Sequence, residues 1–409
     1  MNKLFRSSLA VCSILTFTWL STQTSAATPM LSAGADATCA LTASGSVQCW
    51  GRNTYGQLGD GTTADSASPV TVSGITNAIA VSIGSTHACT LLTGGAVQCW
   101  GRNDAGQLGN GSTTDSTTPT AVSGITNASS VSAGIGFTCA ALATGSVQCW
   151  GSNSAGQLGN GSTTNSTTPV PVTSIASATA VSAGSSHACA LAGNGTVQCW
   201  GANTFGKLGN GSTTSTKVPV AVSGITSAKS VVASSYNTCV VLASGAVQCW
   251  GHNDLGQLGN GTTTNSPTPV TVPGMTNAVS VSVYQFLSCA LLASGSVQCW
   301  GDTTFGSRGS TLVSKSPVTV SGISAAATFS AGANHVCAML GDGGVKCWGS
   351  NLYGQTGSGG STMNKSPVAV ANLNSATMVA AAYNHTCAVL TSGAVQCLSL
   401  IHIPSPRDS

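Results

Sequence analysis

The chain has 409 residues, of which only 5% are charged and 42% are hydrophobic; it contains no glutamate, and its formal net charge is +3. So weak a positive charge excludes the basic surface that nucleic-acid binding needs, and the apolar content is too high for a disordered chain. We therefore expect a folded protein that binds no nucleic acid and whose surface consists mostly of Ser, Thr, Asn and Gly.

The first 27 residues have the three parts of a secretory signal peptide. Lys3 and Arg6 give a basic start, an apolar run covers residues 9–20, and small residues around Ala26 form a cleavage site. The apolar run is short for a bilayer. We therefore predict that residues 1–27 are removed and that the mature protein is secreted, periplasmic or at the cell surface, with no membrane span.

From about residue 31 onward, the chain repeats one segment of about 50 residues. The segment CALTASGSVQCWGRNTYGQLGDG at residues 39–61 returns with small changes in each copy. Seven Trp-Gly pairs mark the phase, with tryptophans at Trp50, Trp100, Trp150, Trp200, Trp250, Trp300 and Trp348. A repeat of this length indicates one supersecondary unit that buries its apolar surface only against its neighbours. Residues 28–397 are therefore predicted to form one repetitive domain.

Each repeat contains four candidate strands. In the second repeat they are Ala78–Gly84, His87–Leu92, Ala96–Gly101 and Thr118–Val122, and residues 93–95 form a hairpin loop between the middle two. The fourth strand opens with proline in every full repeat, which favours a sheet edge. Four-stranded units with two buried faces predict an all-β fold, a radial β-propeller. Seven full repeats and three strands of an eighth predict seven blades, with eight as the alternative.

The repeats resemble those of a known family. WGRNTYGQLGDG, WGRNDAGQLGNG and WGHNDLGQLGNG, each with a cysteine hairpin before it, are similar to the repeats of the regulator of chromosome condensation family. The resemblance covers about nine tenths of the chain and implies a propeller that presents loops to a partner. Nucleotide exchange on a small GTPase, the activity of the nuclear member, is not carried over, because this chain reads as an exported bacterial protein without a basic tail.

The last residues depart from the repeat. After Cys397, the expected Trp-Gly is replaced by LSLIHIPSPRDS. The segment Leu398 to Ile403 back-translates readily to a transposase adapter used in sequencing. We expect residues 398–409 to be a non-native tail and the natural chain to continue past Cys397; a genuine short tail is the alternative.

Sixteen cysteines follow the signal segment, in eight pairs ten residues apart. The pairs are Cys39 and Cys49, Cys89 and Cys99, Cys139 and Cys149, Cys189 and Cys199, Cys239 and Cys249, Cys289 and Cys299, Cys337 and Cys347, and Cys387 and Cys397. Each pair brackets a hairpin turn, so its members should face each other within disulfide reach. In an oxidising compartment we predict one disulfide per blade. Reduced cysteines packed as small core residues are the alternative.

Metal-binding and catalytic patterns are weak in this sequence. Four histidines share one repeat phase, but the other repeats hold Ala37, Phe137, Asn237 and Leu287 there, so we expect structural histidines and no metal or other cofactor. The four are His87, His187, His335 and His385. The aspartates are scattered without a paired phase for acid–base work, and no nucleophile elbow is found. We predict no catalytic residue and no enzymatic activity.

Large side chains gather in the loops after the first strand of some repeats. They are Phe137 in the third repeat, Tyr236 in the fifth, and Tyr284 and Phe286 in the sixth. Exposed aromatic residues on one propeller face would form a contact patch; local packing is the alternative. A second set before the GQLG segment, which includes Phe205, and the seven tryptophans are expected to pack between blades.

The sequence thus favours an exported, monomeric, non-enzymatic propeller that binds an unidentified protein or a surface glycan. A carbohydrate-binding lectin on the same fold is the first alternative and would need Trp, Tyr and Asp or Asn side chains at one repeat phase. A propeller lyase or hydrolase is the second and would need His, Tyr and acidic groups clustered at one axial mouth.

Overall fold

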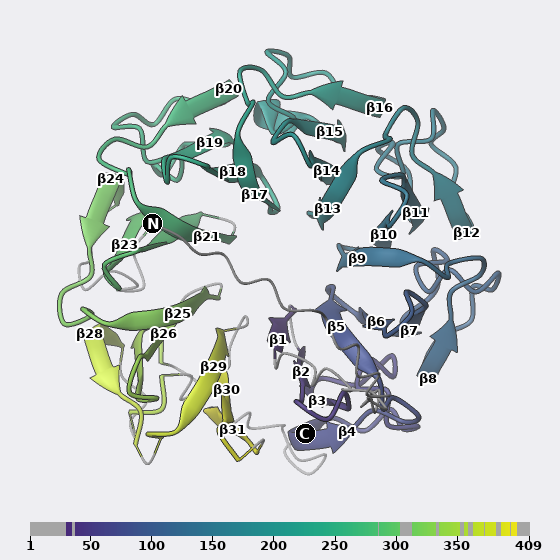
Figure 1. Cartoon of the computed structure of the whole chain (residues 1–409), viewed down its shortest axis with the longest axis horizontal. Coiled ribbons are helices and arrows are strands. Elements are labelled where there is room, and N and C mark those ends of the chain that lie inside the picture. The colour runs from purple at the N-terminus through teal and green to yellow at the C-terminus, as the bar shows by residue number, and fades with distance from the viewer. Residues whose placement is uncertain are drawn as a thin grey trace, which may run out of the picture.

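The computed structural model shows a ring of eight antiparallel sheets (Figure 1). It describes residues 30–34, 37–284, 286–302, 313–332, 335–351, 356–358, 363–371, 373–381, 386–392 and 394–398. The predicted signal segment and residues 399–409 of the predicted non-native tail lie outside these ranges, so both assignments stay predictions. No helix in the described ranges has both the length and the apolar character needed to cross a membrane.

Each blade is built from strands that pair in chain order, with the first strand nearest the axis (Figure 1). The first strands are β1 (Met30–Ala33), β5 (Ala78–Ile83), β9 (Ala128–Ala133), β13 (Ala178–Ala183), β17 (Ala228–Ala233), β21 (Ala278–Tyr284), β25 (Ala326–Ala331) and β29 (Ala376–Ala381). The second strands are β2 (Ala37–Leu41), β6 (His87–Leu92), β10 (Phe137–Leu142), β14 (His187–Ala192), β18 (Asn237–Leu242), β22 (Leu287–Leu292), β26 (His335–Leu340) and β30 (Thr386–Leu390).

The outer half of each blade follows the same plan. The third strands are β3 (Val47–Gly51), β7 (Val97–Gly101), β11 (Val147–Gly151), β15 (Val197–Gly201), β19 (Val247–Gly251), β23 (Val297–Gly301), β27 (Val345–Gly349) and β31 (Val395–Leu398). The fourth strands, at the rim, are β4 (Ser66–Thr71), β8 (Ser116–Ala121), β12 (Ser166–Pro171), β16 (Thr216–Ala221), β20 (Ser266–Thr271), β24 (Ser314–Thr319) and β28 (Asn364–Ala369). One short 3-10 helix, η1 (Thr204–Gly206), follows β15.

The all-β propeller is therefore confirmed, and of the two blade counts the structure has eight. The eighth sheet contains three strands, β29, β30 and β31, within the described residues. The ring closes through contact of this sheet with the first, because Trp50 and Ala40 share a core with Cys387 and Val389. Three strands are enough to bury these side chains, so an incomplete sequence repeat still forms a blade.

The strand pattern follows from burial on both faces. All six residues of β6 are buried, which explains why the second strands read as continuous apolar runs. The rim strand begins earlier than its proline predicts: β8 starts at Ser116, while Pro119 lies inside it. Pairing of β7 with β8 is irregular there, since the register shifts between Cys99 and Gly101. A proline without a ladder donor is tolerated at this irregular outer edge.

The paired cysteines occupy facing positions on the second and third strands, as in the register of Cys139 with Cys149. The structure joins all eight pairs as disulfides. In the first seven blades both sulfur-bearing side chains are fully buried and belong to the cores between blades. Each disulfide therefore joins the second and third strands of its own blade within the buried core.

Each tryptophan fastens its blade to the preceding one. The indole of Trp150 is fully buried, and its Nε1–H donates to the backbone oxygen of Gln107, 2.9 Å away. The same bond recurs at 2.9 Å for Trp100, Trp200, Trp250 and Trp300. Gly109 must be glycine here, because its φ is +69° and a Cβ would lie 2.7 Å from the indole nitrogen of Trp150. The tryptophans are thus packing residues, as the sequence predicts.

Trp50 differs from the other tryptophans at the point where the ring closes. Its side chain is 2% exposed, yet its Nε1–H has no hydrogen-bond partner among the described residues. In ring order the acceptor would be residue 405, which lies outside the described residues. Among the described residues this junction therefore lacks the indole hydrogen bond that the others have, and such a bond contributes to stability.

We predict that Trp150→Phe destabilises the protein more than Trp50→Phe, by about 1 kcal/mol. Both changes remove similar volume, but only the first also removes an indole hydrogen bond. Gln107 O keeps its bond from Thr138 Oγ1, so no acceptor is orphaned. Chemical denaturation of the two variants measures the difference; equal losses would mean that the indole bond contributes little.

Candidate interaction face

The first and third strands of each blade run in the same direction, so both end at the same face of the ring. The loops after the first strands and the long connections to the rim strands therefore lie together on this face, which we call the loop face. The opposite face carries the tight hairpins, such as residues 93–95, and the short connections between blades, such as residues 122–127. Side chains that differ between repeats concentrate on the loop face, which makes it the candidate for partner binding.

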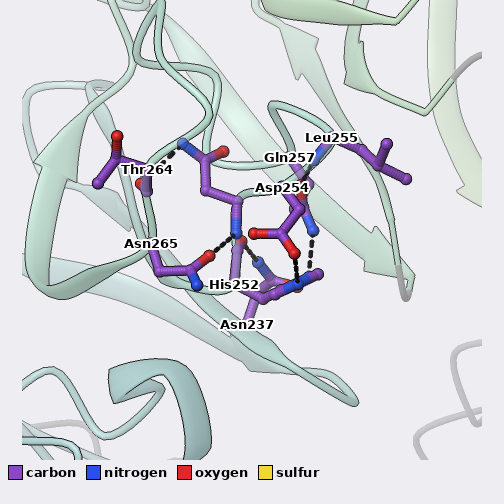
Figure 2. A network of polar contacts seen from close by, with 8 residues as sticks. Asn237, His252, Asp254, Leu255, Gln257, Thr264 and Asn265 are labelled. Atoms are coloured by element: carbon purple, nitrogen blue, oxygen red, sulfur yellow. Dashed lines mark hydrogen bonds and ion pairs between the residues drawn. The ribbon is translucent and has the colours of Figure 1, made fainter.

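A buried asparagine lies at the start of the long connection in the first five repeats and in the seventh. Asn253 Nδ2 donates to the backbone oxygens of Thr262 and Thr264 at 3.1 and 3.0 Å, and its Oδ1 accepts from Leu258 N at 2.9 Å. Asn265 Oδ1 accepts from Asn253 N at 2.6 Å, and Figure 2 shows this network beside His252. Asn103 makes the equivalent hydrogen bonds in the second repeat, whereas the sequence of the sixth repeat has Thr303 at this position. Loop residues are thus held by a rigid frame, although their backbone is irregular.

A shallow pocket of about 220 Å³ opens at the axis on the loop face. It is lined by the ends of the first strands and the residues that follow them, including Ser185, Ser234, Ser235 and Tyr284. Ile135 also lines it and is 53% exposed. The pocket rim is therefore made of small hydroxyl side chains with a few apolar ones.

Four aromatic side chains from blades four to six meet beside this pocket. We call Phe205, Tyr236, His252 and Phe286 the aromatic cluster. The rings of Phe205 and His252 lie 4.3 Å apart, and those of Tyr236 and Phe286 stack at 5.9 Å between centroids. Tyr236 is 38% exposed, and Phe205 and Phe286 are half-buried. The cluster thus offers aromatic surface to solvent while its own members hold it in place.

His252 forms the polar base of the aromatic cluster. Its Nδ1 lies 2.6 Å from Gln257 Nε2, and its Nε2 lies 3.0 Å from Asp254 Oδ2 (Figure 2). The side-chain amide of Gln257 donates to Nδ1 of His252, so Nδ1 carries no hydrogen. The ring proton is therefore on Nε2, which donates to Asp254. These bonds fix the imidazole plane on which Phe205 packs.

The structure corrects one of the predicted contact residues. Phe137 is fully buried and packs with Ala188 in a core between blades three and four, so it offers no surface to a partner. Tyr236 and Phe286 lie in the aromatic cluster, and Tyr284 lines the axial pocket. Phe137 differs because it begins β10, whereas the others belong to loops or strand ends at the face.

The sequence interpretation missed Phe205, His252 and Lys207 as parts of this site. Phe205 was expected only to pack against the neighbouring blade, which it does through Tyr236 and His252. The available signal was departure from the repeat: Lys207 stands where Gln57, Gln107, Gln157 and Gln257 stand in other copies.

Buried histidines pair with the next blade. His87 Nε2 lies 2.8 Å from Thr138 Oγ1, and this hydroxyl donates its hydrogen to Gln107 O. His87 Nε2–H must therefore donate, which leaves Nδ1 buried without a partner among the described residues. Burial accordingly lowers the pKa of His87 to about 4. His187 and His335 pair in the same way with Thr238 and Thr386.

These contacts agree with structural histidines. Within the described ranges, no three His, Cys, Asp or Glu side chains are placed to hold one metal ion. His385 lies outside those ranges.

Comparisons with known proteins identify the repeat. A family model described as the regulator of chromosome condensation (RCC1) repeat matches residues 44–91, 94–141, 144–191, 194–241, 244–291 and 342–389. A second model of that description matches residues 78–107, 128–157, 178–207, 228–257 and 327–355. The altered segment GDTTFGSRGST lies in a stretch that neither model covers. No curated protein matches the chain.

Several solved structures share this architecture. Prp20p from Saccharomyces cerevisiae, described with its binding to Gsp1p and histones, is 19% identical with a TM-score of 0.68, over 86% of this chain and 91% of that one. Yeast RCC1 (Prp20) with Kap60 bound is 17% identical with a TM-score of 0.69, over 98% of this chain and 96% of that one. Human WBSCR16 is 20% identical with a TM-score of 0.71, over 84% of this chain and 99% of that one. Identities this low show the common fold alone.

We predict that the double variant His87→Phe with Thr138→Ala loses part of the protein's acid sensitivity. The folded-state pKa of about 4 lies below the ordinary value of 6.5, so stability is lost as pH falls through this window. For His87 the loss between pH 7 and pH 4.5 is roughly 2 kcal/mol.

Phe137 with Ala188 shows that the replacement pair fits such an interface. Denaturation of the wild type and the variant at both pH values measures the change. An unaltered acid loss would contradict the assignment.

Proposed function

Because this chain belongs to the regulator of chromosome condensation repeat family, we propose that it is a non-enzymatic scaffold that binds a partner protein through its loop face. The aromatic cluster carries this proposal. It is the place where half-exposed rings from three blades adjoin on a frame fixed by buried asparagines. Rigid aromatic side chains provide large contact area at low entropic cost, and such residues dominate binding energy at protein interfaces.

A protein partner fits the cluster better than a glycan. The repeat's tryptophans, which would be the obvious sugar-stacking platforms, are buried between blades. The stacked rings of Tyr236 and Phe286 lie at a phase that is not aromatic in the first four repeats, where it holds Asp36, Thr86, Gly136 and Ser186. A lectin of repeated sites would show the opposite distribution.

We further propose that the protein works outside the cytoplasm, either secreted or at the cell surface. The signal-like first 27 residues and the facing cysteine pairs support this, since disulfides persist in oxidising compartments. The paired cysteines leave no reactive thiol in the described blades.

We predict that the protein isolated without reductant from the culture fluid, periplasm or cell surface carries all eight disulfides. Its intact mass should be lower by two hydrogens per disulfide than the mass of the reduced protein. Cleavage after Ala26 or Ala27 should be visible in the same spectrum. Free thiols throughout, or a retained signal segment, would contradict the proposed compartment.

We predict that Tyr236→Ala with Phe286→Ala abolishes capture of the partner. The immobilised wild type, exposed to proteins from the producer's surroundings, should retain a protein that the double variant does not retain. The loss follows from removing the stacked pair at the centre of the cluster.

The matched control is Val279→Ser, which alters an exposed apolar residue at the opposite end of β21. This control should capture as the wild type does. Capture by the double variant would reject the loop-face proposal, and glycan-array binding that depends on the same residues would favour the lectin alternative.

A further inference from the structure

The turn that contains Lys207 differs from its equivalents. In four other repeats a glutamine at this phase accepts a hydrogen bond from the backbone nitrogen two residues earlier, as Gln257 Oε1 does from Leu255 N at 2.9 Å. An ammonium group has no acceptor, so Lys207 cannot make this bond. The turn forms η1 instead, and Phe205 adopts a φ of +64°. Such a left-handed backbone is unfavourable for a residue other than glycine, and it turns Phe205 onto His252.

The ammonium of Lys207 is buried without a counter-charge. The side chain is 3% exposed, and Nζ donates to Ser186 Oγ and Ser235 O, each 3.1 Å away. In the described part of the chain no carboxylate lies within ion-pair distance of it. Burial lowers the pKa of Lys207 to about 8, so the group is still mostly charged at neutral pH. Buried charges in proteins are normally paired, and this one opposes folding.

One N–H group of Lys207 and the hydroxyl of Ser234, the residue before its acceptor Ser235, have no partner among the described residues. An ammonium has three N–H groups, and two of those of Lys207 have acceptors. Ser234 Oγ is buried with no hydrogen-bond partner among the described residues, and Ser234 and Ser235 both line the axial pocket. Asp254, two residues after His252, is the acidic residue closest in sequence to the aromatic cluster. Its carboxylate contacts His252. The site therefore combines a cation and a free hydroxyl with adjacent aromatic surface.

We propose that Lys207 is the anchor for a carboxylate of the partner protein, an Asp or Glu side chain in a surface loop, with a neighbouring aromatic residue stacked on the aromatic cluster. The inference rests on the proposed function and specifies the partner's chemistry. A carboxylate would supply the missing counter-charge and accept from both Nζ and Ser234 Oγ. The unfavourable lysine and the strained Phe205 are then features of a binding site instead of packing defects.

A small probe tests the anchor without the partner. The protein has six lysines after residue 27, so labelling lysine with ¹³C at Cε gives few signals. We predict that 3-phenylpropionate shifts the Lys207 signal and raises its titration midpoint, whereas 3-phenylpropanamide, which lacks the charge, does neither. Lys207→Gln should bind the acid at least tenfold more weakly. This variant should fold, because glutamine occupies the phase in five other repeats.

The matched control is Lys217→Gln, which removes an exposed lysine from the rim strand of the same repeat and should bind as the wild type does. Equal binding of acid and amide, or unchanged binding by Lys207→Gln, overturns the anchor. In partner capture, loss by both Lys207→Gln and the Tyr236, Phe286 variant supports it. If only the Tyr236, Phe286 variant loses capture, the proposed function stands and the anchor is overturned. If both variants still capture the partner, the proposed function is overturned.

Discussion

The ring depends on one interaction made repeatedly: an indole inserted between two sheets, with its nitrogen bonded to a loop of the preceding blade. Trp150 reaches Gln107 in this way, and that carbonyl also accepts from Thr138. The bond ties the core of one blade to the long connection of its neighbour. Sheet packing and loop geometry are therefore set together in the described long connections.

Most of the fold follows from local rules that the sequence displays openly. The 50-residue period, the facing cysteines and the doubly apolar second strands predict blades, disulfides and strand order, because each depends on residues close in the chain. The blade count is less accessible, since it depends on whether three strands suffice to close the ring. The position of Pro119 was also misjudged, because a register shift at the rim lets the strand begin before it.

The site was only partly predictable for a related reason. Tyr236 and Phe286 could be found as large side chains in variable loops, but Phe137 looks the same in sequence and lies buried. Which loop residue faces solvent depends on the side chain across the blade interface, here Ala188, which is 51 residues away. Lys207 was missed for another reason. It is a single substitution in a repeated turn, and its effect becomes clear only from the structure, where the glutamine of other repeats accepts a backbone hydrogen bond that lysine cannot accept.

The contacts across blade interfaces also fix the circular order of the repeats. Histidine faces threonine at His87 and Thr138 and again at His187 and Thr238, while Phe137 faces Ala188 between them. Removal of the third repeat alone would set an imidazole against a methyl group. Removal of the third and fourth together would restore a histidine opposite a threonine. In this part of the ring, loss of two neighbouring blades is thus less disruptive than loss of one, because the interface residues alternate between a polar pair and an apolar pair.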